Sequence, residues 1–427
     1  MSKNSQRVYL QLFSVLFLLV FSSRLNAQSI GGIVNTYTAV TNITPNSVTV
    51  SSAAGFSVGD RVLLIQMKGA TINQTNTASF GQIVALGSAG NFEFTNISSI
   101  NGNTITFVTN LCKPFSVAGK VQLIRVPVYN QATINAVVTS SPWNGTTGGV
   151  VAIEATTSLT FNNSIDVSGK GFVGGAVTSG FFACNDPNFA SSGASAGKKG
   201  EGIALAPLNL DGNRAPLANG GGGANSGNPG AGGGSNGGAG GRGGNQFSGS
   251  CPVNTAFGMG GYVLNYSTYR AYLGGGGGGG YKDNGLNATV GSNGGGIVFI
   301  LTPTIIGNNQ QIIASGLNVI GNTDSEGAGA GGAGGCVYLL TQNVSSNLNI
   351  NVSGGNGGNI FSTLWSSACH GPGGGGGGGA IVFQQAATPS NVSPLLSGGN
   401  PGSILHTGPA CAGSSFGAQA GAPGLLV

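Results

Sequence analysis

Short apolar stretches recur along the first third of the chain, and none has the spacing of an amphipathic helix. Residues 47–50 alternate between polar and apolar, whereas 61–66 and 121–126 are short, almost continuous apolar runs. Asn101-Gly102 separates two further apolar stretches, 97–100 and 104–107, which is typical of a tight β-hairpin. This pattern predicts a compact N-terminal β domain over residues 28–147.

A repeat begins after this region. Four units start at Gly149, Gly296, Gly335 and Gly379, and each continues as an apolar run, a polar middle, a second short apolar segment and a closing Ser-Gly. The leading glycine and the closing serine are separated by 19, 19, 18 and 18 residues. Continuous apolar runs are typical of strands covered on both faces. We therefore expect an all-β chain in which a β-solenoid-like repeat array fills 148–427, with a long insertion at 169–295.

Glycine dominates the segments between these units. The chain has 83 glycines among 427 residues, including the runs 274–280 and 373–379 and the richer stretch 220–244. Simple disorder requires high charge and low hydrophobicity, whereas this chain is 6% charged and 40% hydrophobic. Glycine-rich chains can form polyproline-II-type helices, here called polyglycine II, whose backbone groups all point outward. We expect such packing where glycines adjoin strands, while flexible linkers remain the alternative, above all for 220–244.

The first 27 residues have the form of an export signal. A basic start with Lys3 and Arg7 precedes the short apolar stretch 9–21, and cleavage is expected after Ala27. No later stretch is long and apolar enough to suggest a transmembrane segment after cleavage. The remaining chain has 12 basic and 10 acidic residues with no basic cluster, so nucleic acid is not expected as a partner.

The chain has six cysteines, and an even number of cysteines in an exported chain favours disulfides. The expected bonds are Cys184 with Cys251 across the insertion and Cys369 with Cys411 across the last unit; Cys112 and Cys336 are left over.

A zinc site remains an alternative at the end of the chain. Cys369, His370, His406 and Cys411 have suitable side chains, but no ligand pair has the close spacing typical of zinc sites. We predict no metal and no other cofactor.

Three stretches suggest a family. GDRVLLIQMKGATIN at 59–73, FGQIVALGSAGNFEF at 80–94 and the segment 143–175 resemble surface proteins of gliding-type Gram-negative bacteria that use type IX secretion. The resemblance implies an exported protein at the outer cell surface or in the medium. Such proteins usually end in a sorting domain, which the ending GAPGLLV does not resemble, so a fragment is one interpretation. The glycine-rich half resembles the polyglycine domains of the anaplastic lymphoma kinase receptor family and of phage tail adhesins.

These features predict a non-catalytic structural or adhesion protein that binds glycans, cell surfaces or other surface proteins. A possible contact surface is formed by five tyrosines around the second glycine run: Tyr262, Tyr266, Tyr269, Tyr272 and Tyr281. The same residues are equally compatible with covering the apolar edge of the array.

Two alternatives belong to other classes. A carbohydrate-active enzyme on a β-helix would need a carboxyl pair, for which Glu154 and Asp166 lie in one repeat unit. A polyglycine ice- or surface-binding protein would need only a flat hydrated face.

Overall fold

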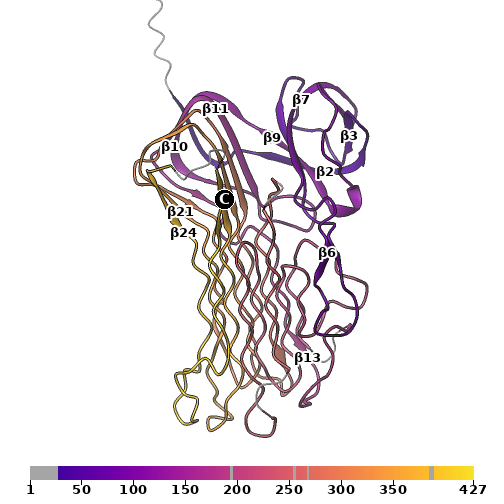
Figure 1. Ribbon diagram of the computed structural model, residues 1–427, viewed down its shortest axis with the longest axis vertical. Helices are drawn as coiled ribbons and strands as arrows, with labels where there is room; N and C mark the ends of the chain where they lie inside the picture. Colours follow the sequence, from indigo (N-terminus) through magenta and orange to yellow (C-terminus); the bar gives the residue numbers. More distant parts are fainter. Residues whose placement is uncertain (1–26, 193–195, 253–255, 267–268, 384–388) are drawn as a thin grey trace, which may run out of the picture.

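The computed structural model describes residues 27–192, 196–252, 256–266, 269–383 and 389–427. The expected export signal at 1–27 therefore lies, except for Ala27, outside the described residues. The described chain is all-β, with one 3-10 turn at Val117–Gly119 as its helical element. Within this part there is no helix that could cross a membrane. Figure 1 shows a small barrel beside a curved sheet, and long glycine-rich segments that extend from the sheet along the long axis of the molecule.

The N-terminal part closes into a six-stranded antiparallel barrel. Its strands, in barrel order, are β2 (Thr36–Ile43), β3 (Ser47–Val50), β8 (Thr104–Phe107), β7 (Phe92–Asn101), β4 (Arg61–Gln66) and β9 (Val121–Val126). The three strands expected at 47–50, 61–66 and 121–126 have these bounds. The expected hairpin is also confirmed: β7 and β8 pair up to Asn101 and Thr104, and Gly102 has a φ of 57°. Glycine adopts this left-handed conformation without steric cost.

A parallel sheet of thirteen strands forms the second part. In its central path, β11 (Val150–Phe161), β15 (Ile297–Leu301), β19 (Cys336–Leu340) and β23 (Ala380–Phe383) stack as successive rungs. The other strands are β1 (Gln28–Ile33), β10 (Val128–Thr139), β12 (Ile165–Asp166), β16 (Thr304–Ile306), β17 (Gln311–Ile313), β20 (Asn343–Ser346), β21 (Leu348–Asn351), β24 (Val392–Leu395) and β25 (Leu425–Leu426).

The four sequence repeats stack in register. Val150, Ile297, Cys336 and Ala380, each of which follows a leading glycine, are consecutive partners across the parallel strands. In the second unit the chain turns from β15 into β16 and β17, and in the third from β19 into β20 and β21, so each of these units forms one coil of a solenoid-like array. The continuous apolar runs are buried because one face packs inside the coil and the other packs against the barrel and the insertion.

The sheet begins earlier than the repeat does. Strands β1 and β10 pair with each other, and β10 also pairs with β11, all in parallel. The barrel itself therefore ends at Val126, and the sequence-based boundary at 147 lies in the connection between two strands of one sheet. The pattern of β10 did not indicate this because no glycine-rich segment leads into it.

The glycine segments form an ordered polyglycine II bundle. The segment 371–379 runs through its interior, and six other segments surround it. Its N–H groups donate to carbonyls in 228–234, 352–358 and 419–422, while its carbonyls accept from 328–334, 238–244 and 399–402 or the adjoining Leu425. Partners recur every third residue, as a helix with three residues per turn requires. The hydrogen bonds thus offset the conformational entropy lost by ordering glycine.

Close approach of the backbones explains why the interior positions are glycine. A Cβ atom added to Gly374, Gly375, Gly376 or Gly377 would lie 2.0–2.2 Å from a carbonyl oxygen of a neighbouring segment. The stretch 220–244, for which linkers were the alternative, is buried in the same bundle, as is the run 274–280. The insertion is therefore an integral part of the array, and its glycines are structural.

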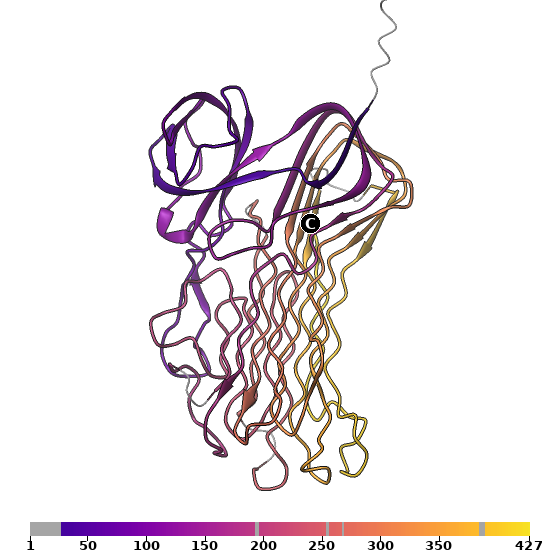
Figure 2. The same ribbon diagram turned by 180° about the vertical axis from the view of Figure 1, so that it is seen from behind.

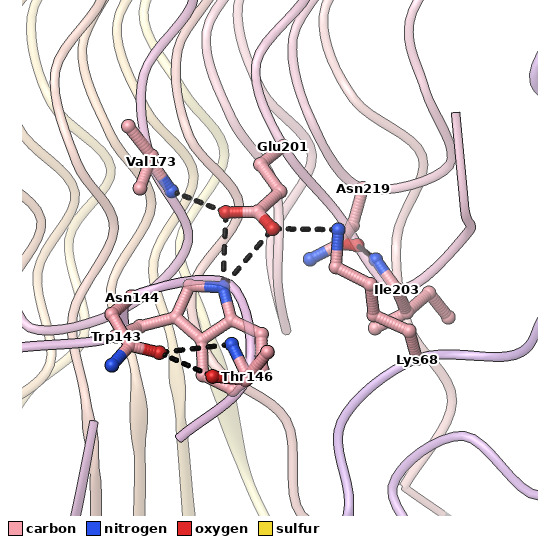
Figure 3. A network of polar contacts seen from close by, with 8 residues as sticks. All are labelled: Lys68, Trp143, Asn144, Thr146, Val173, Glu201, Ile203 and Asn219. Atoms are coloured by element: carbon pink, nitrogen blue, oxygen red, sulfur yellow. Dashed lines mark hydrogen bonds and ion pairs between the residues drawn. The ribbon is translucent and has the colours of Figure 1, made fainter. Parts of the chain in front are cut away.

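A half-buried carboxylate joins the barrel to this bundle, as Figure 3 shows. Glu201, in the insertion, accepts hydrogen bonds from the indole Nε1 of Trp143 at 3.0 Å and from the backbone N–H of Val173 at 3.0 Å. The ammonium of Lys68, in the loop after β4, lies 2.6 Å from the same carboxylate. Burial lowers the pKa of Lys68, and the charge of Glu201 opposes this effect. Each of these polar groups has a partner, so the network holds the two parts together.

Candidate functional site

The loops at the end of the bundle remote from the large sheet (the distal end) enclose a pocket of about 340 Å³. They connect the descending and ascending glycine segments, and Figure 2 shows them gathered at the end of the molecule opposite the barrel. The pocket is lined by Phe182, Asn228, Phe247, Ser250, Asp283, Asn284, Ser325, Trp365 and His370. Its volume lies in the range of small-molecule sites.

Two disulfides cross-link these loops. Cys184 is bonded to Cys251 and Cys369 to Cys411, the pairs expected from the sequence. Cys369 and Cys411 were also the two cysteines of the alternative zinc site. A zinc ion would bind them as thiolates, whereas here their sulfurs are bonded to each other. Of the other cysteines, Cys112 is exposed and Cys336 is buried, and both are free. The loops around the pocket are therefore held covalently.

Aromatic rings form one wall of the pocket. The half-buried Phe247 is central: Phe182 and Trp365 meet it edge-on with centroid distances of 6.0 Å each, and the ring of His370 lies 4.8 Å away. Trp365 is 50% exposed and Phe182 is 41% exposed. Exposed rings fixed by neighbouring rings provide a flat apolar surface that is already ordered before a ligand binds.

His370 adds a polar group to this wall. The side chain is 1% exposed, and its Nδ1 has no hydrogen-bond partner. Burial lowers the pKa of His370 to about 4, and the nearby His406 adds to the effect. The ring is therefore neutral at pH 7, and its Nδ1 is a buried polar atom without a partner beside the pocket.

Two carboxyl groups adjoin each other at this pocket, and one of them, that of Asp283, lines it. Glu326 is fully buried and accepts the backbone N–H groups of Asp283 and Asn284 at 3.1–3.2 Å. Its carboxyl group also interacts directly with that of Asp283. Burial, followed by the charge of Asp283, raises the pKa of Glu326 to about 8. Burial raises the pKa of Asp283 as well.

The five tyrosines do not form one contact surface. Tyr266, Tyr272 and Tyr281 are 5%, 1% and 0% exposed, so a shared ligand surface is a wrong interpretation for them. Tyr266 and Tyr272 pack edge-to-face inside the apolar core between barrel, insertion and sheet. Tyr262 is half-buried and Tyr269 is 65% exposed. The cluster lies mainly at the apolar edge of the array because phenol rings bury more surface there than in solvent.

Tyr269 instead borders a second groove of about 420 Å³ between the barrel and the sheet. Phe92 and Phe94 of β7 and Tyr338 of β19 line it, and Lys113 donates a hydrogen bond to the carbonyl of Tyr269 at 2.9 Å. The rings of Phe92 and Tyr338 contact each other at 5.3 Å. This groove follows the packing interface between the two parts.

The carboxylates considered for an enzyme have separate structural partners. Glu154 forms an ion pair with Arg61 at 3.0 Å, which ties the sheet to the barrel. Asp166 accepts the backbone N–H of Ser168 at 2.8 Å, as in a local turn. Both groups are explained by these contacts.

Sequence reasoning missed the distal pocket. Each of its three aromatic residues lies shortly before a disulfide cysteine: Phe182 two residues before Cys184, Phe247 four before Cys251, and Trp365 four before Cys369. An aromatic residue just before a cysteine that closes a loop is a usable signal, because the disulfide fixes the loop and with it the ring.

No family model and no curated protein matches the sequence. Among solved structures, the tailspike Gp54 of Acinetobacter baumannii bacteriophage AP22, in complex with A. baumannii capsular saccharide, is 12% identical, with a TM-score of 0.18 over 87% of this chain. The tailspike gp49 of Pseudomonas phage LKA1 is 11% identical, with a TM-score of 0.17 over 91% of this chain. The chain spans 57% and 67% of those two proteins.

Proposed function

We propose that this chain is an exported, non-catalytic adhesion protein that binds a saccharide in the distal pocket. The barrel and sheet form its base, and the polyglycine bundle acts as a stiff support that carries the pocket away from it. Two disulfides suit a protein that works outside the cell, where thiols are oxidised.

The observation that carries the proposal is the composition of the pocket wall. Sugars present apolar C–H faces and many hydroxyl groups. The half-exposed rings of Trp365 and Phe182 suit the apolar faces, and the exposed side chain of Asn284 suits the hydroxyl groups. A neutral saccharide also fits a site that contains few charged groups.

A glycan array followed by calorimetric titration of a bound glycan tests this proposal. Removing the ring in Trp365→Ala or Phe182→Ala should weaken binding about tenfold, which corresponds to about 1.4 kcal/mol. Tyr269→Ala is the matched control, since it removes an exposed ring that lines the other groove and not this pocket. Wild-type protein that binds no glycan, or an equal loss of binding in all three variants, would contradict the proposal.

The same preparations test the absence of catalysis. Incubation with any bound polysaccharide should release no shorter product. Product formation that Glu154→Gln or Asp166→Asn abolishes would instead identify an enzyme.

A further inference from the structure

The carboxyl groups of Asp283 and Glu326 interact with each other without a basic partner. In the described part of the chain, three ion pairs are present, and none involves either residue. Glu326 is 0% exposed, so water does not compensate its charge. Of these two adjacent carboxyl groups one is buried and one is half-buried, which disfavours a second negative charge; a shared proton or a bound cation would relieve the repulsion.

An independent feature of the same place is the side chain of Asn228. It is 3% exposed, and its Oδ1 has no hydrogen-bond partner. Its Nδ2 lies 3.4 Å from Oδ2 of Asp283 and 3.4 Å from the carbonyl oxygen of Ser325. Both distances exceed the usual 2.7–3.2 Å for N–H···O bonds. The amide is thus held loosely, with a buried oxygen that nothing in the protein satisfies.

Turning this amide by half a rotation brings three oxygens together. The oxygen and nitrogen of an asparagine side chain have nearly the same shape, so the rotation costs little sterically. Oδ1 would then lie about 3.4 Å from the oxygens of Asp283 and Ser325, where Nδ2 is now. Neighbouring ligands of a calcium ion, at Ca–O distances of 2.3–2.6 Å, are separated by about 3.3–3.7 Å when they lie at right angles. Magnesium, at about 2.1 Å, would need about 3.0 Å.

We propose that Asp283, Glu326, the side-chain oxygen of Asn228 and the carbonyl oxygen of Ser325 form a calcium site beside the distal pocket. Carboxylate, amide and carbonyl oxygens are the ligands that calcium prefers. Among the described residues no group of three or more acidic, histidine or cysteine side chains is placed to hold a metal ion, so neutral oxygens must complete the coordination. Asn228 and Asp283 come from the insertion and Ser325 and Glu326 from the next loop, so the ion would join two loops that line the pocket.

Calorimetric titration of the full secreted chain with Ca²⁺ tests this inference, with terbium luminescence as a second readout. Terbium in the site would be sensitised by Trp365, which lines the same pocket. We expect one ion per chain with a Kd of about 10⁻³ M or tighter, as in extracellular calcium modules. Asp283→Asn and Glu326→Gln, which keep the side-chain shape, should each weaken binding at least about tenfold. Asp211→Asn, which removes a carboxylate paired with Lys198, should leave it unchanged.

The wild-type titration decides the matter without any variant. If no binding is detected at about 10 mM Ca²⁺, or if both variants bind as the wild type does, the inference is wrong. A carboxyl pair that only shares a proton gives the first result. Because these titrations contain no glycan, they are independent of the proposed saccharide binding.

Discussion

The glycine bundle makes a strong prediction for the single methyl group added by Gly376→Ala. The new Cβ would lie 2.0 Å from the carbonyl oxygen of Gly332, whereas ordinary contacts begin near 3.4 Å. The two segments would have to separate by about 1.4 Å. Gly376 is surrounded by other segments, so neither side can move without disturbing further contacts.

The separation stretches the hydrogen bonds that join these two segments. Gly331 donates to the carbonyl of Gly374 at 3.0 Å, and Gly334 donates to that of Gly377 at 2.9 Å. At more than 4 Å both bonds are lost, and four buried polar groups have no partner. With about 1–3 kcal/mol for each broken pair, the free energy of unfolding should fall by about 3 kcal/mol. A valine at this position should cost more.

Equilibrium unfolding in guanidinium chloride, with the disulfides intact, measures this loss. Gly285→Ala is the control, since its Cβ would meet nothing within 4 Å and only its φ of 82° opposes the substitution. That strain costs about 1 kcal/mol. A Gly376→Ala protein that unfolds within about 0.5 kcal/mol of the wild type would refute the packing argument, because that is the range of neutral surface positions.

Two further predictions concern buried charged and titratable groups. The pKa of His370 is about 4 in the folded chain against about 6.5 when unfolded, so its contribution is present above pH 6.5 and is lost as the pH falls to 4. The loss is about 3 kcal/mol of unfolding free energy, and His370→Gln should lack it; an identical pH profile in the variant would contradict this assignment. Glu201→Gln leaves the buried ammonium of Lys68 without its counterion and should cost about 3 kcal/mol, whereas the double variant Glu201→Gln/Lys68→Met should recover part of that loss. Equal stability of the wild type and the single variant would show that the pair is not coupled to folding.

The local structure of this protein follows largely from its sequence. Alternation and short apolar runs gave the barrel strands, and the leading glycines Gly149, Gly296, Gly335 and Gly379 gave the register of the rungs. These features are local or repeated, and a repeat aligns itself when identical units stack. The disulfide pairs could likewise be predicted from the sequence, because each pair joins two cysteines of the same glycine-rich part of the chain.

The sequence also indicated polyglycine II helices, but it did not identify their neighbours. A glycine run has no side chain that specifies a partner. Which segments surround 371–379, such as 228–234 and 352–358, therefore depends on where each segment leaves the strands of the sheet. The same holds for β10, which joins the large sheet only because β11 lies beside it.

The tertiary structure decided which residues form the candidate site. Tyr272 and Trp365 are both aromatic residues in glycine-rich surroundings, yet Tyr272 is 1% exposed in the core and Trp365 is 50% exposed at the distal pocket. Likewise, Asp283 and Glu326 are 43 residues apart in the sequence. They are in contact only because the two loops that contain them are neighbours at the distal end of the bundle. Sequence determines which residues can form strands and helices, whereas the lengths and packing of the segments between them determine which side chains come together.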